Sequence, residues 1–255
     1  MSDPFVTKNI LKWYDLNKRS LPWRKNVSKE KRQYNTLISE FMLQQTQVAT
    51  VIPYFNKFVK EIPNIKKLAS VDNKKLIKLW EGLGYYSRAR NLKKAAQSVI
   101  KNFNGVIPDN FDDLKSLSGI GDYTANAILA IAFNKPYIPL DGNVERIIKR
   151  YLYLKKEKEI QKENLIEKKS ILGFSNRSSD YAQALMEFGA LVCKPTNPLC
   201  CQCPITKKCK SFKKKDFNLT KNSKKYKDKY FLLKVYKKDQ KLSLIHISEP
   251  TRRYR

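Results

Sequence analysis

Four cysteines near residue 200 constrain this chain more than any other feature. Cys193, Cys200, Cys203 and Cys209 stand in the spacing C-x6-C-x2-C-x5-C, which is short enough to surround one inorganic centre. Four thiolates can hold either Zn²⁺ or a [4Fe-4S] cluster. Structural zinc usually takes its ligands from two separated close pairs, whereas only Cys200 and Cys203 form a close pair here. The spacing therefore favours an iron–sulfur cluster, with Cys201 left outside the set.

The chain carries a large excess of positive charge. Its 52 Lys and Arg residues outnumber its 23 Asp and Glu residues, which gives a formal net charge of +29. Such a surface attracts polyanions, so nucleic acid is the first expected partner and an acidic membrane surface the second. No apolar run approaches the roughly 20 residues that span a bilayer, and the start of the chain lacks the pattern of a signal peptide. We expect a cytoplasmic protein.

Apolar residues recur every three to four positions over most of the chain before residue 229, which predicts an all-α body. A lysine-rich linker is expected after it, and residues 230–236 have the composition of a strand. The last segment, 243–255, continues no earlier pattern and is excluded from the fold prediction. It contains the only histidine, His246. Acid–base chemistry in the body must therefore rest on carboxylates, Tyr, Lys or water.

Gly119 and Gly121 lie between two helical patterns, 111–117 and 124–133, and this arrangement predicts a helix-hairpin-helix. Glycines permit a tight turn, and the amides at the start of the second helix can bind a DNA phosphate without reading the base sequence. We expect Asp122, beside the turn, to cap the second helix.

Residues 35–52 have the apolar period of a single helix. Glu40, Gln44 and Gln47 share the edge of its apolar face, where spacings of four and three place them within reach of one another. Partial burial of Glu40 would raise the pKa of its carboxyl group toward the catalytic range.

A second carboxylate, Asp141, precedes the amphipathic run 144–152. It can serve as a helix N-cap, or it can face a developing positive charge at the edge of a cleft. One protonated and one ionised carboxyl group are what cleavage of a glycosidic bond through an oxocarbenium-like transition state requires.

Together these motifs resemble the adenine DNA glycosylases of the MutY type, within the endonuclease III superfamily. The resemblance extends from about residue 5 to residue 211 and is carried by residues 39–48, 80–90, 117–125 and 140–144 and by the cysteine spacing. The hairpin and the cysteines alone indicate only the superfamily. Tyr123 stands where the bifunctional glycosylase/lyases of the superfamily have a Schiff-base lysine, and a tyrosine cannot form that imine, so direct hydrolysis is expected.

The resemblance implies an endonuclease III-like fold for residues 1–211. It divides this region into a helical barrel domain (27–133) and a cluster domain (1–26 and 134–211) with a catalytic cleft between them. It further implies that 212–242 form a linker and the first strand of a truncated Nudix-like β domain, whereas 243–255 are a non-native tail. The four cysteines would hold a [4Fe-4S] cluster.

The same resemblance assigns roles to individual residues. Glu40 would protonate N7 of a flipped-out adenine and help to activate water, and Asp141 would stabilise the cationic sugar. Tyr123 would support both carboxyl groups, and Asn143 would help to hold the water. The residues that line the adenine pocket would be Arg19, Leu21, Trp23, Arg24 and Glu187. Gln44 and Tyr85 would insert into the duplex. The DNA backbone would lie against Gly119 and Gly121.

The function implied is that of a monomeric, monofunctional enzyme of base excision repair. Its substrate would be adenine opposite 8-oxoguanine or guanine in double-stranded DNA. Two other functions stay open: a bifunctional endonuclease III-type glycosylase/AP lyase, and a noncatalytic helix-hairpin-helix protein that binds DNA and has a structural cluster.

Overall fold

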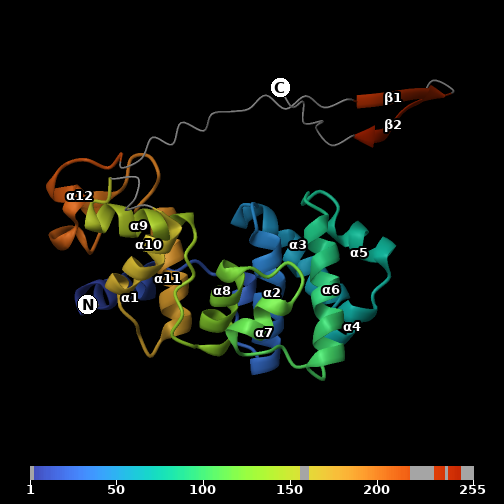
Figure 1. The fold of residues 1–255 in the computed structure, drawn as a ribbon, viewed down its shortest axis with the longest axis horizontal. Coiled ribbons are helices and arrows are strands. Elements are labelled where there is room, and N and C mark those ends of the chain that lie inside the picture. Colours follow the sequence, from blue (N-terminus) through green and yellow to red (C-terminus); the bar gives the residue numbers. More distant parts are fainter. Residues whose placement is uncertain (1–2, 156–160, 219–232, 239–240, 248–255) are drawn as a thin grey trace. The chain divides into compact units, whose positions relative to one another are not determined.

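The computed structural model describes residues 3–155, 161–218, 233–238 and 241–247. The chain divides into two compact units, residues 1–219 and 220–255. The regular elements described in the first unit are helices (Figure 1). Those that precede the hairpin turn are α1 (Pro4–Asn17), η1 (Pro22–Arg24), α2 (Lys29–Leu43), α3 (Val48–Glu61), α4 (Ile65–Ser70), α5 (Asn73–Trp80), α6 (Ser87–Asn102) and α7 (Phe111–Ser116). Those that follow it are α8 (Asp122–Phe133), α9 (Gly142–Leu152), α10 (Lys162–Lys168), η3 (Lys169–Leu172), α11 (Ser178–Leu191), η4 (Cys200–Gln202), η5 (Thr206–Lys208) and α12 (Lys210–Lys213).

Short polar side chains fix where several of these helices begin. Asp3 caps α1, Ser28 caps α2 and Asn64 caps α4, and in each case the side-chain oxygen accepts a hydrogen bond from a backbone N–H of the first turn. Asp141 caps α9 in the same way, so the N-cap role considered for it is present in the structure.

The apolar side chains of this unit form two separate cores. The larger one is built from α2 to α8 and contains Phe41 and Trp80. The second is built from α1, α9, α10 and α11 with the segment that follows them, and it contains Tyr14 and Phe188. Helix α11 packs against α1, α9 and α8, so it connects the two groups, which lie side by side in Figure 1. The domain boundaries predicted from the sequence remain predictions.

The single helix predicted over 35–52 is wrong. Helix α2 ends at Leu43 and α3 begins at Val48, and between them Gln45 adopts a left-handed conformation with φ 56°. The helix ends there because the guanidinium group of Arg88, on α6, donates hydrogen bonds to carbonyl groups at this end: Nη1 donates to the carbonyl oxygens of Met42 and Gln44. Gln44 and Gln47 therefore do not lie on one helical edge with Glu40.

The predicted helix-hairpin-helix is formed by α7 and α8. Gly119 has φ 82°, and a Cβ atom there would lie 2.9 Å from Cε1 of Phe41, so only glycine fits this turn without strain. The prediction that Asp122 caps α8 is wrong, because Gly121 is the N-cap residue of that helix. Asp122 lies in the first turn instead, where its Oδ1 is 2.8 Å from Nζ of Lys115 at the end of α7.

The second unit contains a β-hairpin in its described part. Strand β1 (Leu233–Lys238) pairs antiparallel with β2 (Lys241–Ile247), and the register shifts between Lys234 and Val235. The predicted strand at 230–236 overlaps β1. Strand β2 crosses residue 243, where we placed the start of the tail. Most of the predicted linker and the end of the tail fall on 219–232 and 248–255, outside the described residues, and the Nudix-like assignment remains a prediction.

Candidate active site and cysteine cluster

A cavity of about 220 Å³ lies where α2 and α8 meet the start of α9 and the face of α11. This exceeds the roughly 150 Å³ that accommodates a benzene ring in a protein interior, so a heteroaromatic base is of suitable size. The sequence-predicted residues that line it are Arg19, Leu21, Trp23, Arg24, Glu40, Tyr123, Asp141, Asn143 and Glu187. Segments far apart in the sequence thus contribute to one site.

Glu40 is placed by α2 on the wall of the cavity and is 5% exposed. Burial raises the pKa of its carboxyl group to about 7, and the charge of Asp141 acts in the same direction. Tyr123 and Arg24 partly oppose this rise. The Tyr123 hydroxyl, whose own pKa is raised well above its usual value by burial, donates a hydrogen bond to Sδ of Met186 over 3.4 Å. Near neutral pH, Glu40 can therefore hold a proton and release it.

Asp141 faces the same cavity from the N-terminus of α9. Its carboxylate accepts hydrogen bonds from the backbone N–H groups of Asn143 and Val144, over 3.0 and 2.8 Å, and from Nδ2 of Asn143 over 2.7 Å. These donors favour the ionised form, although burial still raises the pKa of Asp141 above its usual value. The two carboxyl groups thus have different environments: Asp141 is surrounded by N–H donors, whereas Glu40 is buried.

A buried carboxylate, Glu187 on α11, closes the cavity near η1. It accepts hydrogen bonds from the backbone N–H and Nε of Arg19, over 2.8 and 2.9 Å, and from Nη1 of Arg24. A buried charge needs such partners to offset its lost hydration. Glu187 therefore holds the segment 19–24 against α11 and fixes the position of the cavity wall.

Arg146, one turn into α9, connects the cavity to the cysteine loop. Its Nη2 donates to Oδ1 of Asn143 over 2.8 Å and to the carbonyl oxygen of Gly189 over 2.7 Å, and its Nε donates to the carbonyl oxygen of Cys193 over 2.7 Å. Gly189 makes this approach possible, because a Cβ atom there would lie 2.6 Å from Cβ of Asn143.

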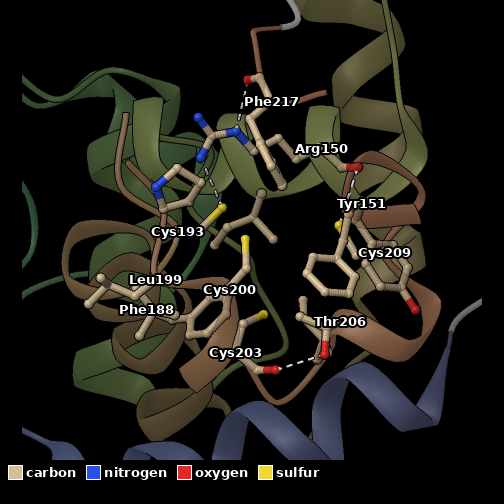
Figure 2. Close-up of a pocket in the computed structure, with 15 residues that line it drawn as sticks. Arg150, Tyr151, Phe188, Cys193, Leu199, Cys200, Cys203, Thr206, Cys209 and Phe217 are labelled. Atoms are coloured by element: carbon tan, nitrogen blue, oxygen red, sulfur yellow. Dashed lines mark hydrogen bonds between the residues drawn. The ribbon is translucent and has the colours of Figure 1, made fainter. Parts of the chain in front are cut away.

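The four predicted ligands, Cys193, Cys200, Cys203 and Cys209, line a second cavity together with Tyr151, Phe188 and Leu199 (Figure 2). Their sulfur atoms face the same space, with Cys209 on the side of Tyr151. The buried guanidinium of Arg150 lies at the edge, and its Nη1 is 3.5 Å from Sγ of Cys193. All five cysteines, including the exposed Cys201, are free thiols.

This donor set fits a cluster bound by thiolates. Burial raises the pKa of Cys203 to about 12 and also raises the pKa values of Cys200 and Cys209, so these thiols would lose their protons only when a cation replaces them. Within the described residues, the structure contains no group of three Cys, His, Asp or Glu side chains already arranged around a single metal ion.

The two residues predicted to enter the duplex lie outside the first cavity, as do Gly119 and Gly121. Gln44 follows the end of α2, and Tyr85 lies in the turn before α6 with 62% of its side chain exposed. Conversely, sequence reasoning did not identify Thr36, Gln183 and Met186 as lining residues. Gln183 lies one turn before Glu187 on α11, so helical spacing from that residue could have found it.

Comparison with known proteins is consistent with this geometry. Residues 38–170 match the model of the HhH-GPD superfamily of base excision DNA repair proteins. The chain therefore belongs to the HhH-GPD superfamily. This confirms the relationship inferred from the sequence motifs.

The relatives to which the chain is similar are adenine DNA glycosylases. That of Buchnera aphidicola subsp. Baizongia pistaciae is 42% identical over 90% of this chain and 66% of its own length. The rat and human proteins are 41% and 40% identical, each over 80% of this chain, and the match covers 41% and 38% of their lengths. The chain thus spans between about two fifths and two thirds of these relatives.

Solved structures confirm the expected fold. A thermostable thymine-DNA glycosylase superposes with a TM-score of 0.72 and 27% identity, covering 82% of this chain and 95% of its own. A trapped endonuclease III–DNA covalent intermediate superposes with a TM-score of 0.66 and 23% identity, covering 83% and 95%. The first unit therefore has an endonuclease III-like fold. No helix in the described part of the chain is long and apolar enough to cross a membrane.

Proposed function

We propose that the chain is a monofunctional adenine DNA glycosylase that releases adenine opposite 8-oxoguanine or guanine from double-stranded DNA during base excision repair. One observation carries the proposal: two carboxyl groups, Glu40 and Asp141, face one cavity, and the first has a pKa of about 7 while the second is held by N–H donors. The similarity to adenine DNA glycosylases supports the choice of base.

The two carboxyl groups suit the two charges that develop during cleavage of the N-glycosidic bond. Protonated Glu40 can donate its proton to N7 of an adenine in the cavity, which turns the base into a neutral leaving group. Asp141 stays ionised and stabilises the oxocarbenium-like sugar. Glu40, now deprotonated, can accept a proton from the attacking water, and Asn143, which lines the same cavity beside Asp141, helps to hold that water.

Hydrolysis without a covalent imine is favoured by the lining of the cavity. A glycosylase/lyase needs an amine nucleophile, and the described residues that line this cavity include no lysine. The hydroxyl of Tyr123 has a raised pKa, so it stays protonated and can hydrogen-bond to a carboxyl group.

We assign a [4Fe-4S] cluster to Cys193, Cys200, Cys203 and Cys209, because these four side chains line one cavity and such a cluster would be held by four thiolates. The backbone of the duplex is assigned to the turn of Gly119 and Gly121. The surface there is open, since a Cβ atom added at Gly121 would meet nothing within 4 Å. Gln44 and Tyr85 would enter the duplex and fill the space that the extruded base leaves.

A single-turnover assay tests the proposal. Duplexes with adenine opposite 8-oxoguanine, guanine or thymine are incubated with excess protein, and iron and sulfide are counted in the same sample. We expect fast release of adenine from the first two duplexes and about four iron and four sulfide per chain. Binding without base release from any duplex would contradict the enzymatic proposal and favour the noncatalytic alternative. Efficient trapping of the DNA on the protein by borohydride would favour the lyase.

A further inference from the structure

Arg88 on α6 has an unusual environment for a charged side chain. It is 6% exposed, and its hydrogen-bond partners in the described structure are backbone carbonyl oxygens rather than a carboxylate. Nη1 donates to the carbonyl oxygens of Phe41 and Met42, over 3.2 and 2.8 Å, and also to that of Gln44. Nη2 donates to the carbonyl oxygens of Leu83 and Gly84, over 3.1 and 3.2 Å. A buried charge of this kind is stabilised by the carbonyl dipoles that surround it.

These carbonyl groups belong to two separate segments. One is the end of α2 with the residues that follow it, 41–45, and the other is the turn 82–86 before α6. Each contains a residue other than glycine in the left-handed region: Gln45 with φ 56° and Tyr85 with φ 47°. Such conformations persist only where surrounding contacts fix them. In addition, the guanidinium lies 5.4 Å from the ring centroid of Tyr85.

We propose that Arg88 is a positioning residue for extrusion of the base. It joins the two segments so that the side chains of Gln44 and Tyr85 enter the duplex as one rigid unit. This inference rests on the proposed function, because it assumes that these two side chains act on DNA.

Lysine cannot replace arginine in this position. The guanidinium presents N–H groups on two terminal nitrogens in one plane, and each nitrogen serves one segment here. Lysine has a single nitrogen with three donors, so it would reach one segment and release the other. The positive charge would be retained, which separates positioning from long-range attraction to DNA.

The decisive experiment places Arg88→Lys in two backgrounds. In otherwise unchanged protein, we expect the single-turnover rate of adenine release to fall about tenfold or more. In protein that already carries Gln44→Ala and Tyr85→Ala, the same substitution is expected to change the rate less than about twofold, because the residues through which it acts are gone. A loss by the same factor in both backgrounds would overturn the proposal, since a general structural defect acts equally in both. The matched control is Arg90→Lys, an exposed arginine on the same helix, for which we expect no change in rate.

Two further measurements do not require the Arg88 variant to be active. In protein with Arg88 intact, Gln44→Ala and Tyr85→Ala are expected to be non-additive in rate, whereas strict additivity would contradict a rigid unit. In free protein, Arg88→Lys is expected to accelerate hydrogen exchange at residues 44–46 and 84–86 together. Unchanged exchange would overturn the inference even if the wild-type protein released no adenine, an outcome that would count separately against the proposed function.

Discussion

The carboxyl groups of Glu40 and Asp141 face the same cavity, and the charge of Asp141 adds to the burial that raises the pKa of Glu40 to about 7. The carboxylate of Asp141 accepts hydrogen bonds from backbone N–H groups at the start of α9, whereas the carboxyl group of Glu40 is buried on α2. The negative charge is therefore placed on Asp141 and the proton on Glu40 near neutral pH.

The rate of adenine release is expected to fall as the pH rises through about 7. Only the protonated form of Glu40 can donate to the base, and that form decreases about tenfold for each pH unit above its pKa of about 7. Single-turnover rates between pH 5.5 and 9 give the profile, with the affinity for product duplex measured in parallel. A flat profile over this range would exclude Glu40 as the rate-determining acid.

Glu40→Gln is expected to abolish adenine release while duplex affinity stays within a few-fold of wild type. The amide has nearly the same shape as the carboxyl group but cannot donate the proton. Gel-shift titration and the single-turnover assay on the same duplex make the comparison. Substantial remaining activity would eliminate the proposed acid.

The same substitution should change how stability depends on pH. The pKa of Glu40 in the folded protein, about 7, lies above its ordinary value of 4.5. The contribution of Glu40 to the free energy of unfolding is therefore fully present below about pH 4.5 and is lost as the pH rises through 7. Complete ionisation would cost about 3 kcal/mol. Between pH 4.5 and 8, the melting temperature of Glu40→Gln is therefore expected to fall less than that of wild type. Parallel curves would show that Glu40 is not buried as a neutral group.

Glu187→Ala is expected to destabilise the protein by about 3 to 5 kcal/mol, because it leaves the cations of Arg19 and Arg24 without their buried partner. The matched control is Asp15→Ala. Asp15 also pairs with an arginine, Arg177, but both side chains are more than 40% exposed, and such pairs contribute less than about 1 kcal/mol. Urea unfolding of both variants measures the difference, and equal losses would contradict the role assigned to Glu187.

Gly189→Ala is expected to displace Asn143 and to reduce the rate of adenine release. The new methyl group would lie 2.6 Å from Cβ of Asn143 and 3.1 Å from its backbone, and overpacking of this kind costs about 1 to 3 kcal/mol. Gly142→Ala, where an added Cβ meets nothing within 4 Å, serves as the control for stability. Unfolding free energies and single-turnover rates are compared, and a neutral Gly189→Ala would show that α9 and α11 can separate without consequence.

The sequence predicted the cavity better than it predicted the path of the backbone. Its motifs identified Glu40, Asp141 and Glu187 as neighbours because each lies in a short pattern that resembles a known family. The break after α2 could not be predicted in this way, because the apolar period continues from Phe41 into Val48. The residue that ends the helix, Arg88, lies far along the chain from Gln44 and contacts it only in the folded structure.

The role of Asp122 was misjudged for a related reason. Aspartate beside a glycine turn is typical of an N-cap, but Gly121 occupies that position and Lys115 lies close enough to pair with the carboxylate. Likewise, Met186 and Thr36 enter the cavity from α11 and α2 without any polar motif to mark them. Local patterns therefore located the charged groups, whereas the apolar and backbone partners required the tertiary structure.

Helix α9 has Asp141 at its N-terminus and, about one and two turns on, contacts the segment after α11 through Arg146 and Arg150. A helix of this length is stiff, so a displacement at one end tilts the whole helix and moves its other end. A displacement of the backbone at Cys193 and Lys194 is therefore expected to move the carboxylate of Asp141 within the cavity.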